Sequence, residues 1–544
     1  MARRRRAALL KNPGRHGAED AHRTRRFQDG GTPGRVDDPV FPEHGCLRER
    51  ESEGDFGVNG RNVLLIVADE FARHALGCAG HPAVQTPNLD RLAARGVRFT
   101  RAYTNSPICV PARAAMHTGR YVHDIRCWSS AQPYRGRPES WAHRLRRRGM
   151  DAVSAGKLHF RRTADDNGFA PELRAMHVKD GIGWAPGLLR DPPGDYPAAA
   201  ELAGQVGAAE TEYHAYDRAV ADAATGWLEA RAATGGPPWA LFVSFVSPHY
   251  PLAAPPAWFD LYADADLPVP KPYAGNWRDH PALRETLRFF DYDRHFDAGS
   301  RDAATRAYFG LVSFVDDLIG RVLAALEAGG FADETTVLFT SDHGEMLGDY
   351  GLWTKQVMFE GSAGIPAILA GPGIVGGIAA GRTVETPVSL VDVFPTVLDA
   401  VGAPPLPEPG PESGPDPLPG RSLLEIAAES DDPERPVLSE YHDGGSVTGA
   451  FMLRRGDWKL VHHEGYPPQL FNLSDDPDEQ RDLAAEPAAA DILASMQTGL
   501  RDIVDPAAAN RQAFADQRAR LEELGGADAV RAMDGYDFGY SPTE

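Results

Sequence analysis

The chain has 544 residues, of which 42% are hydrophobic and 24% charged. This is ample material for a large core, so we expect a globular protein with one large domain and a smaller one. The formal net charge of −21 argues against a nucleic-acid partner, because binding to phosphates requires a basic surface.

Residues 1–59 are rich in Arg, Asp, Gly and Pro, with few apolar side chains. This composition buries too little surface to offset the entropy of ordering, so we expect a disordered leader. The apolar piece that follows Arg3 to Arg6 is too short for a secretory signal. No apolar run approaches the roughly 18 residues that cross a bilayer. We therefore expect a cytoplasmic protein without a membrane partner.

The chain has four cysteines, at positions 46, 78, 109 and 127. Four in so long a chain make no disulfide framework, and none forms a CxxC pair that would indicate zinc. We interpret Cys46, Cys78 and Cys127 as structural or incidental, in a reducing compartment. Cys109 has a different sequence context, described below.

Three apolar runs are typical of strands buried on both faces of a parallel sheet: residues 62–68, 239–246 and 336–340. Asp69 directly follows the first, Ser247-Pro248-His249 the second, and Ser341-Asp342-His343 the third. Open α/β sheets bind their ligands at the carboxyl ends of their strands. The three runs therefore predict that these polar side chains meet at one edge of a sheet.

Helical periodicity over residues 311–326, between the second and third runs, indicates an amphipathic crossover helix. This alternation predicts an α/β fold, with a large, mainly parallel sheet flanked by helices over residues 60–403. A Pro/Gly/Glu-rich stretch predicts a linker or loop over residues 404–435. Four short strand candidates and an Ala-rich tail predict a smaller α+β subdomain over residues 436–544.

Cys109 lies in Asn105-Ser106-Pro107-Ile108-Cys109-Val110-Pro111-Ala112-Arg113. This segment resembles the signature of the type I sulfatases, which is Cys, any residue, Pro, any residue, Arg. Further blocks look like this family's, in the family's order: Thr86 to Leu92, Gly156 to His159, Ser247 to His249, Thr340 to Glu345, and Lys355. The resemblance spans nearly all of residues 62–475. It implies an alkaline phosphatase-like fold.

In the sulfatase family a maturation enzyme converts the signature cysteine to formylglycine in the unfolded chain. The resemblance implies this modification for Cys109. One hydroxyl of the hydrated aldehyde attacks sulfur and displaces the alcohol. The other hydroxyl, once deprotonated, expels sulfate, so that water never attacks the sulfur atom.

A nucleophilic oxyanion near neutral pH requires a cation, and hard divalent ions favour carboxylate ligands. The resemblance implies that Asp69, Asp342 and His343 hold this ion beside residue 109. Glu70 occupies a position where many members have a further acidic ligand and others have glutamine. We expect calcium, with magnesium and manganese as alternatives, because oxygen and imidazole ligands admit all three.

The resemblance also implies roles for five further side chains around the sulfate group. Arg113 would brace the formylglycine hydroxyl, His159 would orient it, and Lys157 and Lys355 would contact the sulfate. His249 would protonate the leaving oxygen. Each has an ordinary structural alternative: lysines are usually solvated at the surface, and a histidine after a strand often only completes hydrogen bonds.

Several features are most similar to the bacterial branch that contains choline sulfatases and phosphonate monoester hydrolases, among them the block Gly156 to His159 and the segments 439–442 and 466–471. Trp128-Ser129-Ser130 departs from an Asp-Asn pair common in the family, which leaves substrate preference open. The leading hypothesis is therefore hydrolysis of a small sulfate ester. The alternative is a phosphodiester or phosphonate monoester hydrolase on the same scaffold.

A third hypothesis is a non-catalytic binding protein in which Cys109 stays unmodified. A related membrane phosphoryl-transferase is disfavoured because the sequence has no apolar run long enough to span a bilayer. Family members often oligomerise through the C-terminal tail, so a homo-oligomer is also an expectation.

Overall fold

The computed structural model describes residues 62–191, 193, 196, 198–276, 278–372, 379–403 and 417–533. The leader predicted over residues 1–59, including Cys46, lies outside the described residues, as do residues 404–416 of the predicted linker. All the described residues belong to one compact unit.

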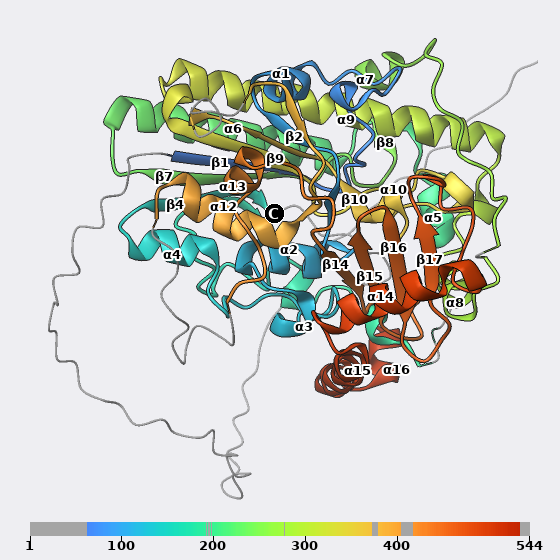
Figure 1. Cartoon of the computed structure of the whole chain (residues 1–544). Helices are drawn as coiled ribbons and strands as arrows, with labels where there is room; N and C mark the ends of the chain where they lie inside the picture. Colours follow the sequence, from blue (N-terminus) through green and yellow to red (C-terminus); the bar gives the residue numbers. More distant parts are fainter. Residues whose placement is uncertain are drawn as a thin grey trace, which may run out of the picture. The chain divides into compact units, whose positions relative to one another are not determined.

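An eight-stranded sheet forms the centre of this unit, in the order β12-β2-β11-β9-β1-β7-β4-β5 (Figure 1). Its bounds are β1 (Asn62–Ala68), β2 (Val97–Phe99), β4 (Asp151–Lys157), β5 (Glu172–Met176), β7 (Trp239–Phe245), β9 (Thr335–Thr340), β11 (Ala367–Ala370) and β12 (Arg382–Val384). The five strands from β9 to β5 run parallel, whereas β11 pairs antiparallel with both β9 and β2. The three predicted strands are thus the adjacent central strands β9, β1 and β7.

Alternate side chains of β1 face two separate cores. Leu64 and Ile66 pack toward α1 (Pro87–Arg95), α6 (Glu212–Thr234) and α9 (Ala298–Ala328). Val63 and Leu65 pack toward the opposite layer, which contains α2 (Cys109–Thr118), α4 (Trp141–Arg147), α12 (Val393–Ala400) and α13 (Leu423–Ala428). Figure 1 shows α1, α6 and α9 above the sheet and α2, α4 and α12 below it. Both faces of the sheet are covered, which explains the continuous apolar runs.

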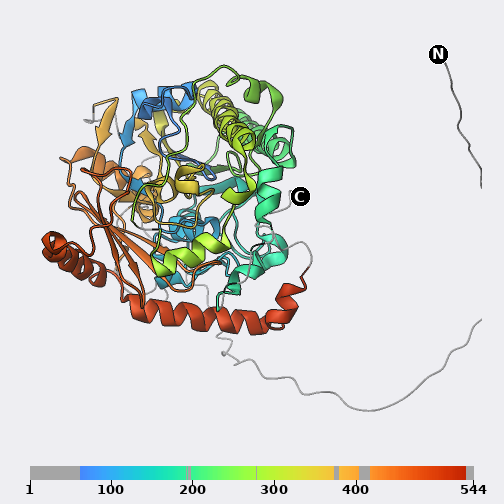
Figure 2. The same cartoon turned by 90° about the vertical axis from the view of Figure 1, so that its right-hand side faces the viewer.

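The C-terminal part forms a four-stranded antiparallel sheet of β14 (Val437–Tyr441), β15 (Ala450–Arg455), β16 (Trp458–His463) and β17 (Gln469–Asn472). One face packs on α14 (Ala490–Arg501) and α15 (Pro506–Glu523), which α16 (Ala527–Arg531) follows. These helices, in red, lie at the margin of the described structure (Figures 1 and 2). The other face packs against residues 346–363 of the larger part. The predicted fold class, including a smaller C-terminal α+β subdomain, is confirmed.

Shorter elements connect these layers: β3 (Ala102–Tyr103), β6 (Gly207–Ala208), β8 (Ala253–Ala254), β10 (Gly364–Ile365), β13 (Val388–Ser389), α3 (Val122–Ile125), α5 (Ala199–Gly204), α7 (Pro256–Asp260), α8 (Pro281–Phe289) and α10 (Glu360–Ala363). Helix α13 lies within the range predicted as a linker, where Leu423 and Ile426 enter the core.

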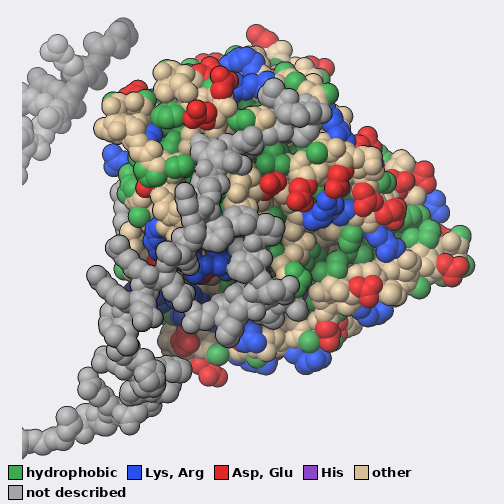
Figure 3. All heavy atoms as spheres, turned by 60° about the vertical axis from the view of Figure 1, so that its left-hand side comes forward, with side chains coloured by type: hydrophobic (Ala, Val, Ile, Leu, Met, Phe, Trp, Pro, Cys, Tyr) green, Lys and Arg blue, Asp and Glu red, His purple; other side chains and the backbone are tan. Residues whose placement is uncertain are grey.

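The surface of the described residues carries charges of both signs. On the face shown in Figure 3, acidic and basic side chains are interspersed between apolar ones. Among the described helices, none combines the length and apolarity needed to cross a bilayer.

Candidate active site

Four parallel strands deliver polar side chains to the same edge of the central sheet. Asp69 directly follows β1, Lys157 is the last residue of β4, His249 follows β7 by four residues, and Asp342 follows β9 by two. All four side chains are buried. Asp69, His249 and Asp342 therefore lie at one edge of the sheet, as expected. Lys157 joins them from a strand that the apolar pattern did not predict.

Strand β4 was not predicted because it contains only one β-branched apolar side chain. Its residues are Asp151-Ala152-Val153-Ser154-Ala155-Gly156-Lys157. Gly156 has a positive φ of 104°, and a Cβ there would collide with the carbonyl oxygen of Ser244 in β7. Glycine therefore allows β4 to approach β7 closely, just before Lys157.

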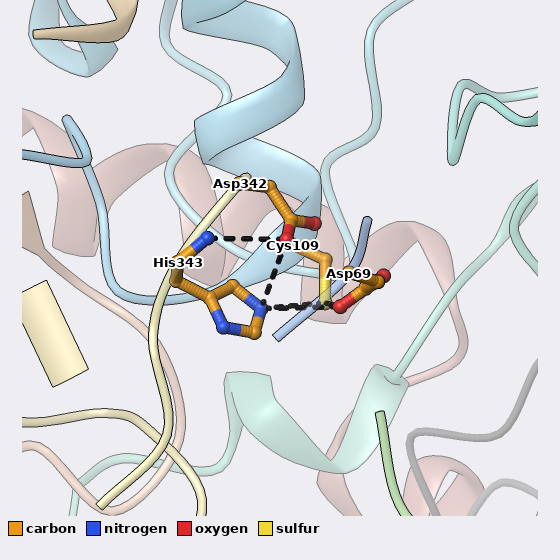
Figure 4. Close-up of side chains that lie close together, drawn as sticks. All are labelled: Asp69, Cys109, Asp342 and His343. Atoms are coloured by element: carbon orange, nitrogen blue, oxygen red, sulfur yellow. Dashed lines mark hydrogen bonds and ion pairs between the residues drawn. The ribbon is translucent and has the colours of Figure 1, made fainter. Parts of the chain in front are cut away.

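Cys109 is the first residue of α2, a helix whose ten residues are all buried. Its Sγ lies 3.1 Å from Nε2 of His343 and 3.7 Å from Oδ1 of Asp69 (Figure 4). Burial, together with the charge of Asp69, raises the pKa of the Cys109 thiol. Because the thiolate is the nucleophilic form, the unmodified side chain is a poor nucleophile.

Asp69, Cys109, Asp342 and His343 form a compact group. Each contributes one atom suited to hold a metal ion, and these atoms lie within 4.8 Å of one another. Figure 4 shows the four side chains pointing toward a common centre. Nδ1 of His343 lies 3.1 Å from the carbonyl oxygen of Gly344, so its N–H donates there and the lone pair of Nε2 faces the group. Two carboxylates and an oriented imidazole fit a divalent cation.

The guanidinium of Arg113 connects this group to two neighbouring strands. Nε donates to Asp342 over 2.7 Å and Nη2 to Asp69 over 3.1 Å. Nη1 donates to the hydroxyl of Ser244 at 2.8 Å and to the carbonyl oxygen of Lys157 at 2.7 Å. Lys157 also forms an ion pair with Asp69. Although burial opposes ionisation, the positive charges around Asp69, with Lys157 foremost, hold its pKa well below the usual range.

Lys355 and His249 form the other side of the site. Nζ of Lys355 lies 2.8 Å from Oε2 of Glu70 and 2.8 Å from Nε2 of His249. Nδ1 of His249 donates to the carbonyl oxygen of Tyr250 at 2.7 Å, so Nε2 accepts a hydrogen bond from the ammonium of Lys355. Burial and the charge of Lys355 lower the pKa of His249 well below its usual value, which leaves the ring neutral.

Glu70 is buried in a left-handed conformation, with φ 62°. The carboxylate of Glu70 lies close to the side chains of Asp69 and His249 and is not part of the group of four residues that contains Cys109. Oε1 receives no N–H or O–H from any described residue. Burial raises the pKa of Glu70 well above its usual value, and the adjacent Glu345 carboxylate raises it further against the pull of Lys355.

His159 is buried in a left-handed conformation two residues beyond β4, with φ 54°. Burial and the charges of Lys157 and Arg113 lower its pKa well below the usual value, so the ring is neutral. Every residue that the sequence marked as catalytic or metal-binding is therefore buried near the strand ends. Cys78 and Cys127 lie elsewhere, in or against the hydrophobic cores.

The sequence did not predict a role for three residues that support the site. Ser244 bonds to Arg113, and its signal was a polar residue inside the apolar run of β7. Asp217 in α6 accepts hydrogen bonds from the backbone of Val246 and Ser247 at 2.7 and 2.8 Å, which holds the turn before His249. Nothing in the helical pattern of α6 marked Asp217. Glu345 was visible within a family block but had no role assigned.

Comparisons with known proteins place the chain in a family. Residues 61–403 match the family model described as Sulfatase, and residues 348–505 match the model of the N-sulphoglucosamine sulphohydrolase C-terminal region. A choline-sulfatase from Rhizobium meliloti is 33% identical over 454 residues, which cover 81% of this chain and 86% of that protein. An arylsulfatase K from Danio rerio is 31% identical over 462 residues, covering 82% and 84%.

Among solved structures, the phosphonate monoester hydrolase of Agrobacterium radiobacter is similar with a TM-score of 0.66 and 27% identity, covering 81% of this chain and 95% of that one. The resemblance drawn from the sequence motifs is confirmed by these matches. The chain belongs to the sulfatase family, whose members hydrolyse sulfate esters.

Proposed function

We propose that this chain hydrolyses a small-molecule sulfate ester to an alcohol and inorganic sulfate, with a formylglycine derived from Cys109 as nucleophile. The observation that carries the proposal is the position of Cys109, at the start of α2 and within 4.8 Å of the donor atoms of Asp69, Asp342 and His343. The raised pKa of the thiol supports a modified side chain, because an unmodified one would remain protonated.

Asp69, Asp342, His343 and residue 109 are the proposed ligands of one divalent cation. Glu70 is a further candidate through Oε1, which has no hydrogen-bond donor among the described residues. The ion would stabilise the negative charge of the nucleophile and of the sulfate oxygens. Calcium, magnesium and manganese all suit these oxygen and nitrogen donors, and calcium is our first expectation.

The hydrated aldehyde at position 109 would supply one hydroxyl to bond to sulfur and a second whose deprotonation releases sulfate and restores the aldehyde. Arg113 and His159 hold this side chain in place. Lys157 and Lys355 bind the sulfate oxygens, where fixed positive charges favour the transition state. As the ester S–O bond breaks, the hydrogen-bonded pair of Lys355 and His249 delivers the proton that the leaving oxygen requires.

A phosphodiester or phosphonate monoester hydrolase is the second candidate function. It is favoured by the similarity to the phosphonate monoester hydrolase of Agrobacterium radiobacter, which extends over 95% of that structure. Both substrate classes present tetrahedral oxyanions, so the same cationic side chains serve either reaction.

The test is to produce the chain together with a formylglycine-generating enzyme and to analyse the tryptic peptide 102–113 by mass spectrometry. We expect loss of the thiol mass and capture of the aldehyde by a hydrazide. In the same preparation, kcat/KM for an aryl sulfate should exceed that for an aryl phosphonate ester. The reverse order would select the second function.

Cys109→Ala is the control, and it should remain folded but lose turnover. Wild-type activity in a clean preparation of this variant would overturn the formylglycine mechanism. A thiol that persists beside the maturation enzyme, with no hydrolysis of either ester, would support a binding protein instead.

A further inference from the structure

Glu345 lies two residues beyond His343 and is not used by the reaction proposed above. Its side chain is 1% exposed. Oε1 accepts hydrogen bonds from the backbone N–H groups of Leu347, at 2.7 Å, and Thr354, at 2.6 Å. A single carboxylate oxygen therefore binds both the beginning and the end of the loop of residues 345–354, beside the backbone hydrogen bond from Met346 to Thr354 at 2.8 Å.

The backbone of this loop is strained. Four of its residues and near neighbours that carry a Cβ adopt positive φ: Leu347 at 48°, Tyr350 at 60°, Thr354 at 65° and Gln356 at 77°. The left-handed region is unfavourable for such residues, and most of all for β-branched threonine. These conformations persist only where surrounding contacts enforce them. The hydrogen bond from Thr354 to Glu345 is one such contact.

Lys355 directly follows Thr354, so the backbone conformation of Thr354 influences the direction in which the side chain of Lys355 points. Gln356 holds the other side of Lys355. Its Oε1 accepts the backbone N–H of Lys355 at 3.1 Å, and its backbone N–H donates to the carbonyl oxygen of Pro107 at 3.1 Å. Pro107 lies two residues before Cys109, so the loop is tied to the segment that carries the nucleophile.

We propose that Glu345 is a positioning residue for sulfate hydrolysis, which keeps Thr354 left-handed and thereby directs the ammonium of Lys355 into the site. The inference rests on the role proposed above for Lys355. Without the Glu345 carboxylate, two buried N–H groups lose their acceptor and the backbone at Thr354 relaxes. Nζ of Lys355 then leaves its place 2.8 Å from His249.

The test is a double-mutant cycle with Glu345→Ala and Lys355→Met, assayed on an aryl sulfate, with rates corrected for the formylglycine content of each protein. Misplacement of a catalytic group by about 1 Å lowers rates on the order of 100-fold, so Glu345→Ala should lose about that much kcat/KM, and Lys355→Met, which removes the ammonium, at least as much. The double variant should be within about threefold of Lys355→Met, because residues that act through one another are not additive.

The activity of Glu345→Gln distinguishes a positioning role of the Glu345 side chain from a general contribution to folding. Its amide oxygen accepts the same two N–H groups, so we expect kcat/KM within about fivefold of the parent. Asp316→Ala is the matched control, since Asp316 is also a buried carboxylate that accepts two backbone N–H groups, from Asn88 at 3.1 Å and Leu89 at 2.8 Å. Any loss it causes should add to that of Lys355→Met.

Additive losses for Glu345→Ala and Lys355→Met would overturn the proposal. So would parental activity in either single variant, or a Glu345→Gln enzyme as impaired as Glu345→Ala. If Glu345→Ala does not fold, Glu345→Asp replaces it in the cycle, because it keeps the charge but withdraws the oxygen from the loop. Cys109→Ala, measured alongside, separates the two proposals: turnover in that variant would refute the formylglycine mechanism whatever the Glu345 variants do.

Discussion

Arg113 and Asp342 form an ion pair in which Nε lies 2.7 Å from Oδ2 and neither side chain is exposed. Arg113 belongs to α2, whereas Asp342 follows β9, so the pair joins the helix of Cys109 to the strand end that carries His343. The same guanidinium reaches Asp69 over 3.1 Å. One cation thus holds together two carboxylates that would otherwise repel each other.

Arg113→Lys should lower kcat/KM by at least about 100-fold, although it preserves the charge. A lysine ammonium is a point charge and cannot reproduce the planar set of bonds to Asp342, Asp69 and Ser244. Steady-state kinetics and circular dichroism of the purified variant check this expectation. Arg95→Lys, in an exposed ion pair with Glu327, is the control and should be neutral. An Arg113→Lys enzyme within threefold of the parent would contradict the argument.

Asp342→Asn should lose bound metal as well as activity, because a neutral amide would replace the charged carboxylate of a proposed ligand. Glu70→Gln makes the same chemical change outside the group of four donors, so it should retain more metal. Elemental analysis after dialysis against metal-free buffer measures both variants. Unchanged metal in Asp342→Asn would remove Asp342 from the ligand set. Equal loss in the two variants would place Glu70 among the principal ligands.

Asp217→Ala should impair the release of poor leaving groups most, because Asp217 holds the turn that positions His249. Protonation of the leaving oxygen contributes most when the released alcohol is a weak acid. The measurement is kcat/KM for a series of aryl sulfates whose phenols differ in pKa. The loss should grow as the pKa of the phenol rises. A uniform loss across the series would mean that Asp217 does not act through His249.

His123 in α3 and Glu440 in β14 form a pair in which Nδ1 of His123 lies 2.7 Å from Oε1 of Glu440. This pair should make the free energy of unfolding depend on pH. Burial opposes the charged ring, but Glu440 outweighs it and raises the pKa of His123 to about 9. The unfolded pKa is about 6.5, so the stabilisation is complete below that pH and disappears as pH rises through 9. It amounts to roughly 3 kcal/mol at most.

Thermal unfolding of the parent and of His123→Gln between pH 6 and pH 10 tests the expected pH dependence of stability. The parent should have the higher Tm at pH 6, and the difference should shrink toward pH 10. Curves that stay parallel over this range would show that His123 and Glu440 contribute no pH-dependent stability.

Sequence patterns predicted the central strands β1, β7 and β9 because each is covered on both faces and therefore continuously apolar. They did not predict β4, whose small residues are explained by its close approach to β7 at Gly156. The ligand candidates were visible as polar residues at strand ends. Asp217 was not, because it acts through the backbone of a loop that is distant in sequence, and Glu345 was visible in a family block without any sign of its role. Such pairings depend on the folded path of the chain and leave no local periodicity.

The first turn of α2 is enclosed on every side, and Cys109 itself is only 5% exposed. A maturation enzyme of the kind proposed for Cys109 would need several residues around it in an extended, accessible form. Under the maturation proposed for Cys109, folding and modification would compete for the same segment, and the order of the two events would decide the fate of each molecule. Chains that fold first would be trapped with a thiol, so the rate of folding relative to modification sets the active fraction of any preparation.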